Sequence, residues 1–246
     1  MLDPARVKVI IFDYDGTLRD SINPDVPGTK PHAFAQAVAR YHPALKDREP
    51  EIARIYFETS GMNRVRQLRI VEERFKISNP IEAEKESEWS ALFDTCTNDR
   101  EWPLFPDALP ALTALRKRGY SLGIGSSIPQ QRLETVMSYH SELLDKFEFL
   151  LGNQKWHKGL GDEANFGKGI SYTAYVCGKY GVTPEQVAYV GDTPEDMKSG
   201  FESGVYTIGR VDARIPHRRE KLIAEFPPDL TIESLMELLD TFTKPV

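Results

Sequence analysis

The chain has 246 residues, of which 40% are hydrophobic and 28% are charged, so it is long enough to fold as one large domain or two modest ones. The formal net charge is −6 without a long basic run, and no apolar stretch is long enough to span a membrane, so neither nucleic acid nor a membrane is an expected partner. Two cysteines are too few for a disulfide framework, and we expect a cytoplasmic protein that binds a small molecule, as a monomer or a homodimer.

Residues 7–12 predict a strand buried on both faces of a parallel sheet, because β-branched and aromatic side chains fill the run almost without a break. Asp13 and Asp15 follow it directly, at the carboxyl end of the strand, where open α/β sheets place their ligands. If the backbone stays extended through Tyr14, both carboxylates lie on the same side. Two such charges 4 Å apart repel by about 4 kcal/mol at an effective dielectric constant of about 20, so the pair implies a cation.

An isolated Asp-x-Asp-Gly sequence is more often an ordinary turn, in which Gly16 supplies the unusual φ and Thr17 caps the next element. The full stretch Asp13-Tyr14-Asp15-Gly16-Thr17-Leu18 after an apolar strand is more specific, and it resembles the first motif of the haloacid dehalogenase superfamily. The resemblance implies that Asp13 attacks phosphorus as a nucleophile and that Asp15 acts as general acid and base. It also implies a bound Mg²⁺, and that Thr17 contacts the phosphoryl oxygens.

The segment after this motif is predicted to be helical. Three prolines and a glycine in residues 19–31 indicate a connector, and apolar residues at helical spacing then continue to about residue 102, enough for about four helices. An inserted helical block at this place resembles the cap domain of many superfamily members. We therefore expect an α/β fold with a Rossmann-like three-layer core and a mostly parallel sheet (1–18 and 105–246), plus an α-helical cap domain (19–104).

Arg64 and Arg66 are the candidates in the cap for contacting a substrate anion, because they lie near a predicted helix start, where an anion is favoured. The alternative is that these arginines and Arg69 form a solvated face paired with Glu72 and Glu73.

A second buried strand is predicted for residues 120–125, ending at Ser126 and Ser127, with a helix from about residue 130 to 139. A hydroxyl at such a strand end can bind phosphate, although capping of the following helix explains it equally well. The placement of Ser126 resembles the second superfamily motif, which implies that Ser126 binds the transferred phosphoryl group.

A third strand is predicted for residues 147–151, followed by a glycine-rich loop at 152–167. The loop contains His157, but no partner with metal-ligand spacing accompanies it, so we interpret it as a solvated loop residue. Lys168 then opens a helix that runs to about Tyr180. A lone lysine there is usually surface charge, but its position resembles the third motif, which implies that Lys168 neutralises the nucleophile and the phosphoryl oxygens. Many relatives have Lys-Pro where this chain has Lys168-Gly169.

A fourth strand at residues 187–190 ends in Gly191 and Asp192, and Asp196 follows four residues later. If Thr193 caps a helix that begins at Pro194, favourable interaction with the helix dipole explains Asp196 without any function. The segment nevertheless resembles the fourth motif, which implies that Asp192 ligates Mg²⁺ directly together with Asp13 and the backbone carbonyl of Asp15, while Asp196 supports the metal ligands.

Together the motifs imply a Mg²⁺-dependent phosphatase of the phosphoglycolate phosphatase-like or β-phosphoglucomutase-like branch, which hydrolyses a small phosphorylated metabolite through an aspartyl-phosphate. A phosphomutase shares every motif and stays an alternative. A phosphonate hydrolase would need a Schiff-base lysine from the cap, and a dehalogenase would lack Asp15. A non-catalytic binding module would have no need of so many charged groups.

Overall fold

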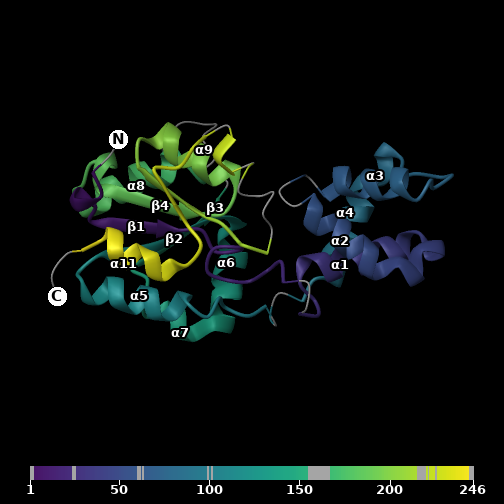
Figure 1. Ribbon diagram of the computed structural model, residues 1–246, viewed down its shortest axis with the longest axis horizontal. Helices are drawn as coiled ribbons and strands as arrows, with labels where there is room; N and C mark the ends of the chain where they lie inside the picture. Colours follow the sequence, from purple (N-terminus) through teal and green to yellow (C-terminus); the bar gives the residue numbers. More distant parts are fainter. Residues whose placement is uncertain are drawn as a thin grey trace. The chain divides into compact units, whose positions relative to one another are not determined.

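A computed structural model of the protein describes residues 3–23, 26–59, 62, 64–98, 100, 102–154, 167–214, 220, 222–224 and 226–243. The chain divides into two compact units, shown in Figure 1: Met1–Arg19 with Leu104–Val246, and Asp20–Pro103. The sequence analysis placed these divisions at residues 18/19 and 104/105. The first unit contains the sheet, and the second is built from helices.

The first unit contains a parallel sheet of six strands in the order β3-β2-β1-β4-β5-β6. All four residues of β1 are buried, as expected for a central strand covered on both faces. The parallel α/β sheet predicted from the sequence is therefore confirmed. The strands are β1 (Val9–Phe12), β2 (Ser121–Pro129), β3 (Phe149–Asn153), β4 (Val187–Gly191), β5 (Tyr206–Arg210) and β6 (Leu230–Ile232).

Helices cover both faces of this sheet, which gives the predicted three layers (Figure 1). Successive residues of β1 point to opposite faces, so Ile10 and Phe12 join one hydrophobic cluster and Val9 and Ile11 another. The first cluster includes residues of α5, α6, α7 and α11, and the second includes residues of α8. The α-helices of the unit are α5 (Ala108–Lys117), α6 (Gln130–Met137), α7 (Ser141–Leu144), α8 (Ile170–Tyr180), α9 (Pro194–Ser203) and α11 (Leu238–Thr241).

Strand β2 is longer than the sequence analysis predicted, because it continues past Ser126 to Pro129. Its pairing with β3 shifts register between Gly125 and Pro129, where Pro129 pairs with Asn153. The polar residues after Gly125 therefore continue the ladder across an irregularity instead of leaving the sheet. Residues 152 and 153 likewise belong to β3, and residues 155–166 of the expected glycine-rich loop, His157 included, lie outside the described residues.

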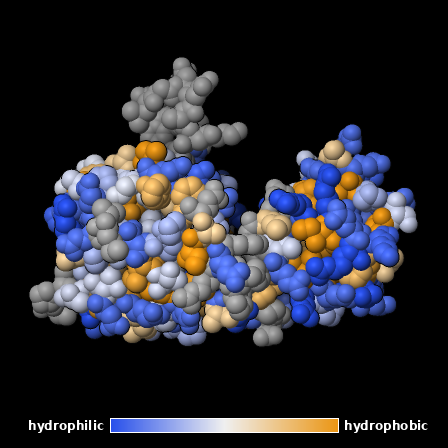
Figure 2. All heavy atoms as spheres, turned by 45° about the horizontal axis from the view of Figure 1, so that its top comes forward, coloured by the Kyte–Doolittle hydropathy of each residue, from blue (hydrophilic) through white to orange (hydrophobic). Residues whose placement is uncertain are grey.

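Among the described residues of the second unit there are four α-helices, joined in part by short 3₁₀ segments, where the sequence predicts about four. Its core gathers around Phe34 and Trp89, whose rings meet edge to face with centroids 5.8 Å apart. The face of the molecule shown in Figure 2 is largely hydrophilic, with hydrophobic side chains in small groups. The helices are α1 (Lys30–Tyr41), α2 (Glu49–Glu58), α3 (Arg64–Arg74) and α4 (Glu86–Cys96).

In the part of the chain that the structure describes, none of the helices combines the length and the apolar character that a membrane crossing requires.

Phe242 packs into the hydrophobic core of the first unit. Its side chain is 0% exposed, and its ring lies 5.4 Å from that of Tyr120 and 6.5 Å from that of Tyr206, centroid to centroid. Phe242→Ala should lower the free energy of unfolding by about 3–5 kcal/mol, because it leaves a cavity. Phe201→Ala is the matched control, because Phe201 is 67% exposed and its loss should cost about 1 kcal/mol or less. Urea denaturation measures both values, and similar losses would contradict this assignment of the core.

Candidate active site

The ends of β1 and β4 bring the first two predicted acids together. The two strands are parallel neighbours in which Phe12 pairs with Val190, and the Asp13 N–H donates to the Val190 carbonyl at 2.8 Å. Asp13 and Asp192 each come directly after the last residue of their strand. The carboxyl ends of parallel strands lie at one edge of the sheet, so the register itself places these side chains side by side.

Three buried carboxylates gather at this edge. Asp13, Asp192 and Asp196 each offer an oxygen, and these oxygens all lie within 4.8 Å of one another. Lys168 lies among them, with Nζ 2.8 Å from Asp13 Oδ1 and 2.6 Å from Asp196 Oδ1. Two of the three carboxylates therefore share one ammonium group, so a single positive charge is set against two negative ones.

The protonation states of Asp13 and Lys168 reflect this balance. Burial raises the pKa of Asp13 to about 8, with Lys168 lowering it and Asp196 and Asp192 raising it further. Burial alone would lower the pKa of Lys168, but Asp13 and Asp196 reverse the effect and raise that pKa well above its usual value. Lys168 therefore stays charged, while Asp13 needs more positive charge nearby to ionise fully at neutral pH.

Asp196 has a structural role in addition to its contact with Lys168. Thr193 caps α9, and Asp196 Oδ2 accepts from the Thr193 backbone N–H at 2.9 Å and from its hydroxyl at 2.6 Å. The prediction that Thr193 caps a helix beginning at Pro194 is therefore confirmed, and Asp196 completes a capping box with it. Because the other oxygen binds Lys168, both oxygens of Asp196 are engaged, and Asp13 and Asp192 are the better candidates for holding a cation directly.

Oxygen donors of this kind fit a hard divalent cation. Mg²⁺ in proteins takes one or two carboxylates and keeps waters or phosphate oxygens in its other positions. Asp13 and Asp192 supply two carboxylates next to each other, at an edge of the sheet that is rich in negative charge. The donor set is therefore suited to Mg²⁺, with Asp196 and Lys168 as neighbours of the ligands.

The turn after β1 packs directly against Asp192. Gly16 has a φ of +87°, and a Cβ added there would lie 2.3 Å from Asp192 Oδ2. Thr17 is fully buried, and its hydroxyl donates to Asp192 Oδ1 at 3.5 Å. Glycine is therefore required at position 16 both by its backbone conformation and by the close approach of a carboxylate.

Ser126 lies at the same edge of the sheet, because Ile124 of β2 pairs with Phe12 of β1. The residue is buried, and its Oγ accepts from the Ile128 N–H at 3.3 Å. Its backbone carbonyl accepts from the Tyr172 hydroxyl at 2.9 Å. Ser126 does not cap the following helix, the alternative considered from the sequence, because Ser126 and Ile128 both belong to β2 and the N-cap of α6 is Pro129. The position of the hydroxyl allows the phosphate-binding role that the motif implies.

Asp15 differs from the sequence expectation. The acids that act on the charge of Asp13 are Asp196 and Asp192, whereas Oδ1 of Asp15 accepts from Nε of Arg19 at 2.8 Å and from Nη2 at 2.6 Å. The repulsion expected between Asp13 and Asp15 is thereby reduced, because the two acids are paired with different cations, Lys168 for Asp13 and Arg19 for Asp15. Simple strand alternation did not predict this arrangement, because the chain turns at this point and Gly16 N–H bonds to the Arg19 carbonyl.

Arg210 is a residue of the site that sequence reasoning missed. It ends β5, and its Nη1 donates to the Thr17 carbonyl at 2.6 Å while Nη2 lies 3.1 Å from each oxygen of Asp107. The available signal was an arginine shortly after the mostly apolar residues 205–208, a position comparable to those of Asp13 and Asp192 after their own apolar runs. Arg210 therefore holds the turn that carries Thr17.

The candidate arginines of the second unit have different partners from those expected. Arg64 Nη1 lies 2.7 Å from Asp94 Oδ1, and Arg69 Nη2 lies 2.7 Å from Glu86 Oε1. Glu72, expected as a partner of this face, instead binds Nε2 of His42 at 2.8 Å. Arg66 is exposed, and no ion pair is recorded for it among the described residues. Arg64 therefore belongs to an ion-paired helix face, and Arg66 keeps an exposed guanidinium.

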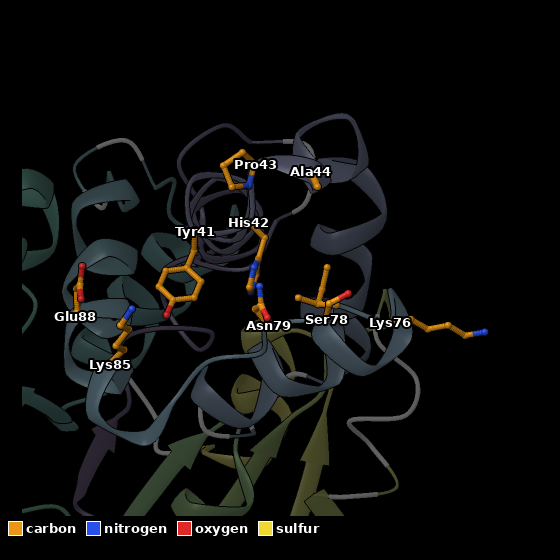
Figure 3. A pocket seen from close by; sticks show the side chains of 10 residues that line it. Tyr41, His42, Pro43, Ala44, Lys76, Ser78, Asn79, Lys85 and Glu88 are labelled. Carbon is orange, nitrogen blue, oxygen red and sulfur yellow. The ribbon is translucent and has the colours of Figure 1, made fainter.

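A pocket of about 560 Å³ opens in the second unit and is shown in Figure 3. Tyr41 and His42 at the end of α1 line it, opposite Lys85 and Glu88 from the start of α4 and Asn79 from the intervening loop (Figure 3). The residues that line this pocket include none of those that the motifs identify.

Comparison with known proteins identifies relatives over most of the chain. A phosphoglycolate phosphatase of Pasteurella multocida is 27% identical over 139 residues, which are 55% of this chain and 56% of that protein, so the chain spans about half the length of this relative. A phosphoglycolate phosphatase of Vibrio cholerae is 24% identical over 237 residues, 95% of this chain and 96% of that protein. A protein of Clostridium perfringens named as a candidate pyrophosphatase is 25% identical over 250 residues, 97% of this chain and 98% of that protein.

Solved structures share the fold. A haloacid dehalogenase family hydrolase of Deinococcus radiodurans R1, determined with bound phosphate and sodium, has a TM-score of 0.68 and 19% identity and covers 98% of this chain and 100% of its own. A phosphoglycolate phosphatase candidate from Haemophilus somnus has a TM-score of 0.64 and 20% identity, over 96% of this chain and 97% of its own. At these identities the likeness concerns the fold alone.

The family model for "haloacid dehalogenase-like hydrolase" matches residues 7–204. The match begins just before β1 and ends just after α9, so it contains all the acids of the site and Lys168. Because it covers well over half of the chain, this protein belongs to the haloacid dehalogenase-like hydrolases.

Proposed function

We propose that the protein is a Mg²⁺-dependent phosphatase that hydrolyses a small phosphomonoester through an aspartyl-phosphate on Asp13. The observation that carries the proposal is the buried Asp13 carboxylate, held by Lys168 and adjacent to Asp192 at the carboxyl edge of the sheet. The names of the Vibrio and Pasteurella relatives support a phosphatase. Without cations this site would repel a phosphate ester, so its surplus of carboxylates also supports the dependence on a metal.

In the first step a carboxylate oxygen of Asp13 bonds to phosphorus while the bond from phosphorus to the ester oxygen breaks. Asp15 gives a proton to the departing oxygen, so an alcohol leaves instead of an alkoxide. Lys168, hydrogen-bonded to Asp13 Oδ1 at 2.8 Å, stays close to the phosphoryl oxygens as the charge moves toward them.

In the second step water attacks the phosphorus of the aspartyl-phosphate, and Asp15, now ionised, takes the proton of that water. The bond from Asp13 to phosphorus breaks, which restores the Asp13 carboxylate and releases inorganic phosphate. Thr17 and Ser126 would hold phosphoryl oxygens in both steps.

Mg²⁺ would be held by the carboxylates of Asp13 and Asp192 and by the backbone carbonyl of Asp15, and it would supply positive charge against the phosphoryl oxygens. Asp196 fixes Lys168 next to these ligands, since both of its oxygens are engaged by Lys168 and Thr193. The role proposed for Asp196 is therefore to support the ligands without binding the metal.

The helical unit Asp20–Pro103 would act as the cap that selects the substrate, with the exposed Arg66 as a candidate contact for a substrate anion. The name of the Clostridium relative makes pyrophosphate a second candidate substrate. A phosphomutase would use the same core residues. It would return the phosphoryl group to a sugar instead of to water.

The first test of the proposal is a panel of phosphate compounds assayed with Mg²⁺: phosphoglycolate, glycerol 2-phosphate, glucose 6-phosphate, pyrophosphate and p-nitrophenyl phosphate. Release of inorganic phosphate from at least one monoester is expected. Asp13→Asn should lower kcat by at least about 1,000-fold, because an amide oxygen cannot serve as the nucleophile.

Asp145→Asn is the control for this substitution, because Asp145 is an exposed acid of the same unit and its change should leave kcat unaltered. Full activity in Asp13→Asn would contradict the nucleophile assignment. Conversion of glucose 1-phosphate to glucose 6-phosphate without phosphate release would favour the mutase.

Metal removal tests the cofactor. Treatment with EDTA should abolish phosphate release, and excess Mg²⁺ should restore it. Binding of Mg²⁺ at about 100 times its Kd should stabilise the wild-type fold by about 2.7 kcal/mol, visible as a rise in Tm. Asp192→Asn should stay folded but show no rise in Tm with Mg²⁺. An equal rise in Tm in the variant would show that Asp192 is not a metal ligand.

Gly16→Ala probes the packing of the turn against Asp192. Alanine at a positive φ costs about 1–2 kcal/mol, and its Cβ would also push against the Asp192 carboxylate. Gly119→Ala is the matched control, because Gly119 has a φ of +78° and a Cβ there meets nothing within 4 Å. Thermal unfolding should show a larger loss of stability for Gly16→Ala than for Gly119→Ala, because only the first adds a steric clash to the backbone strain, and the Mg²⁺-dependent rise in Tm should disappear only in Gly16→Ala. Retention of that rise in Gly16→Ala would contradict the role of this contact.

A further inference from the structure

Arg19 is a fully buried arginine next to the acid–base candidate. Its side chain is 1% exposed, whereas that of Asp15 is 17% exposed. Nε and Nη2 both donate to Asp15 Oδ1, at 2.8 and 2.6 Å. An arginine is costly to bury without a partner, so its placement here indicates a specific role for this ion pair.

The rest of the guanidinium environment keeps Arg19 in one place. The guanidinium lies over the ring of Tyr14, with 4.6 Å from Cζ to the ring centroid, and that ring is fully buried. The buried ring limits where the guanidinium can lie, and from that position its N–H groups reach Asp15.

The backbone of Arg19 is fixed as well. Its N–H donates to the Tyr14 carbonyl at 3.0 Å, and its carbonyl accepts from the Gly16 N–H at 2.8 Å. Arg19 also forms an isolated antiparallel β-bridge with Leu104. The chain leaves the first unit after Arg19 and returns to it at Leu104, so this bridge joins the two crossing points. The turn from Asp13 to Arg19 is thus closed on itself, and Arg19 cannot move without disturbing Asp15.

We propose that Arg19 is the positioning residue for Asp15: its buried guanidinium, fixed on the Tyr14 ring, orients the Asp15 carboxyl group for proton transfer to and from the ester oxygen. The proposal rests on the phosphatase function proposed above. Arg19 touches neither substrate nor metal in this scheme, and it acts only through Asp15.

A role of this kind depends on the leaving group. An alkyl phosphate releases a strongly basic alkoxide and needs the proton from Asp15, whereas p-nitrophenolate is weakly basic and leaves without it. Arg19→Met should therefore lower kcat/KM, which covers the steps up to departure of the leaving group, about 10–100-fold for the alkyl phosphate of the panel that the wild type hydrolyses fastest. The kcat/KM for p-nitrophenyl phosphate should change by about 3-fold or less, whereas kcat can fall for both substrates because both pass through the same aspartyl-phosphate, which Asp15 helps water to hydrolyse.

Two further variants and a double variant sharpen the test. Arg19→Lys keeps the charge but loses the two-point contact, so it should show the same selective loss at smaller size. In an Asp15→Asn background Arg19→Met should cause no further loss, because its only effect passes through Asp15. Arg116→Met is the matched control, since Arg116 is ion-paired with Glu148 in the same unit and its loss should affect neither substrate.

The outcomes separate the two proposals. If the wild type releases phosphate from no monoester, the phosphatase function fails and the role of Arg19 fails with it. If the wild type is active but the Arg19 variants lower kcat/KM equally for both substrates, or for neither, only the positioning role is overturned. If Arg19→Met does not fold, as judged by circular dichroism, Arg19→Lys decides between the same outcomes, because it retains the positive charge that Asp15 requires.

Discussion

The site depends on the placement of several buried carboxylates at one edge of a parallel sheet. Asp13, Asp192 and Asp196 are all buried and close enough to share a cation. Charges of one sign in such surroundings are tolerated only when opposite charges are fixed among them. Lys168, ahead of α8, is the cation paired with Asp13 and Asp196, while Arg19 and Arg210 are paired with the neighbouring acids Asp15 and Asp107.

The order and direction of the strands bring these charged side chains to the same edge of the sheet. With β1 between β2 and β4 and all strands parallel, the residues after each strand meet at the same edge. Arg210 extends the connection one strand further, because it joins the Thr17 carbonyl to Asp107, whose Oδ2 also accepts from the Ser234 hydroxyl and the Leu235 N–H. The turn that carries Thr17 is therefore held by segments from opposite ends of the chain.

The parts of this structure that depend on local signals were predictable from the sequence. The apolar run of β1, the strand before Asp192 and the cap at Thr193 are encoded within a few residues, and each is present. The partners of charged side chains were not predictable in the same way. Asp15 meets Arg19 because the chain turns through Gly16, and Arg64 meets Asp94 because α3 and α4 pack together, which no spacing in the sequence reveals. The length of β2 was missed for a related reason: Pro129 continues the strand only because β3 offers Asn153 as its partner.

The two acids of the first motif have cations of different chemistry, and the difference matches the roles proposed for them. Lys168 is a compact ammonium that two carboxylates share, at 2.8 and 2.6 Å, so it can redirect a hydrogen bond toward phosphoryl oxygens without leaving its place. Arg19 has a planar guanidinium that lies over an aromatic ring and donates from two N–H groups to one oxygen of Asp15. A planar group with two donors is suited to hold the Asp15 carboxyl group in one orientation. A nucleophile benefits from a neighbour that can adjust as charge moves away from it, and a proton donor benefits from a neighbour that keeps it directed at one atom. The exchange of these two cations would leave the charge balance of the site unchanged but would remove both advantages, so the type of cation at each acid matters as much as its presence.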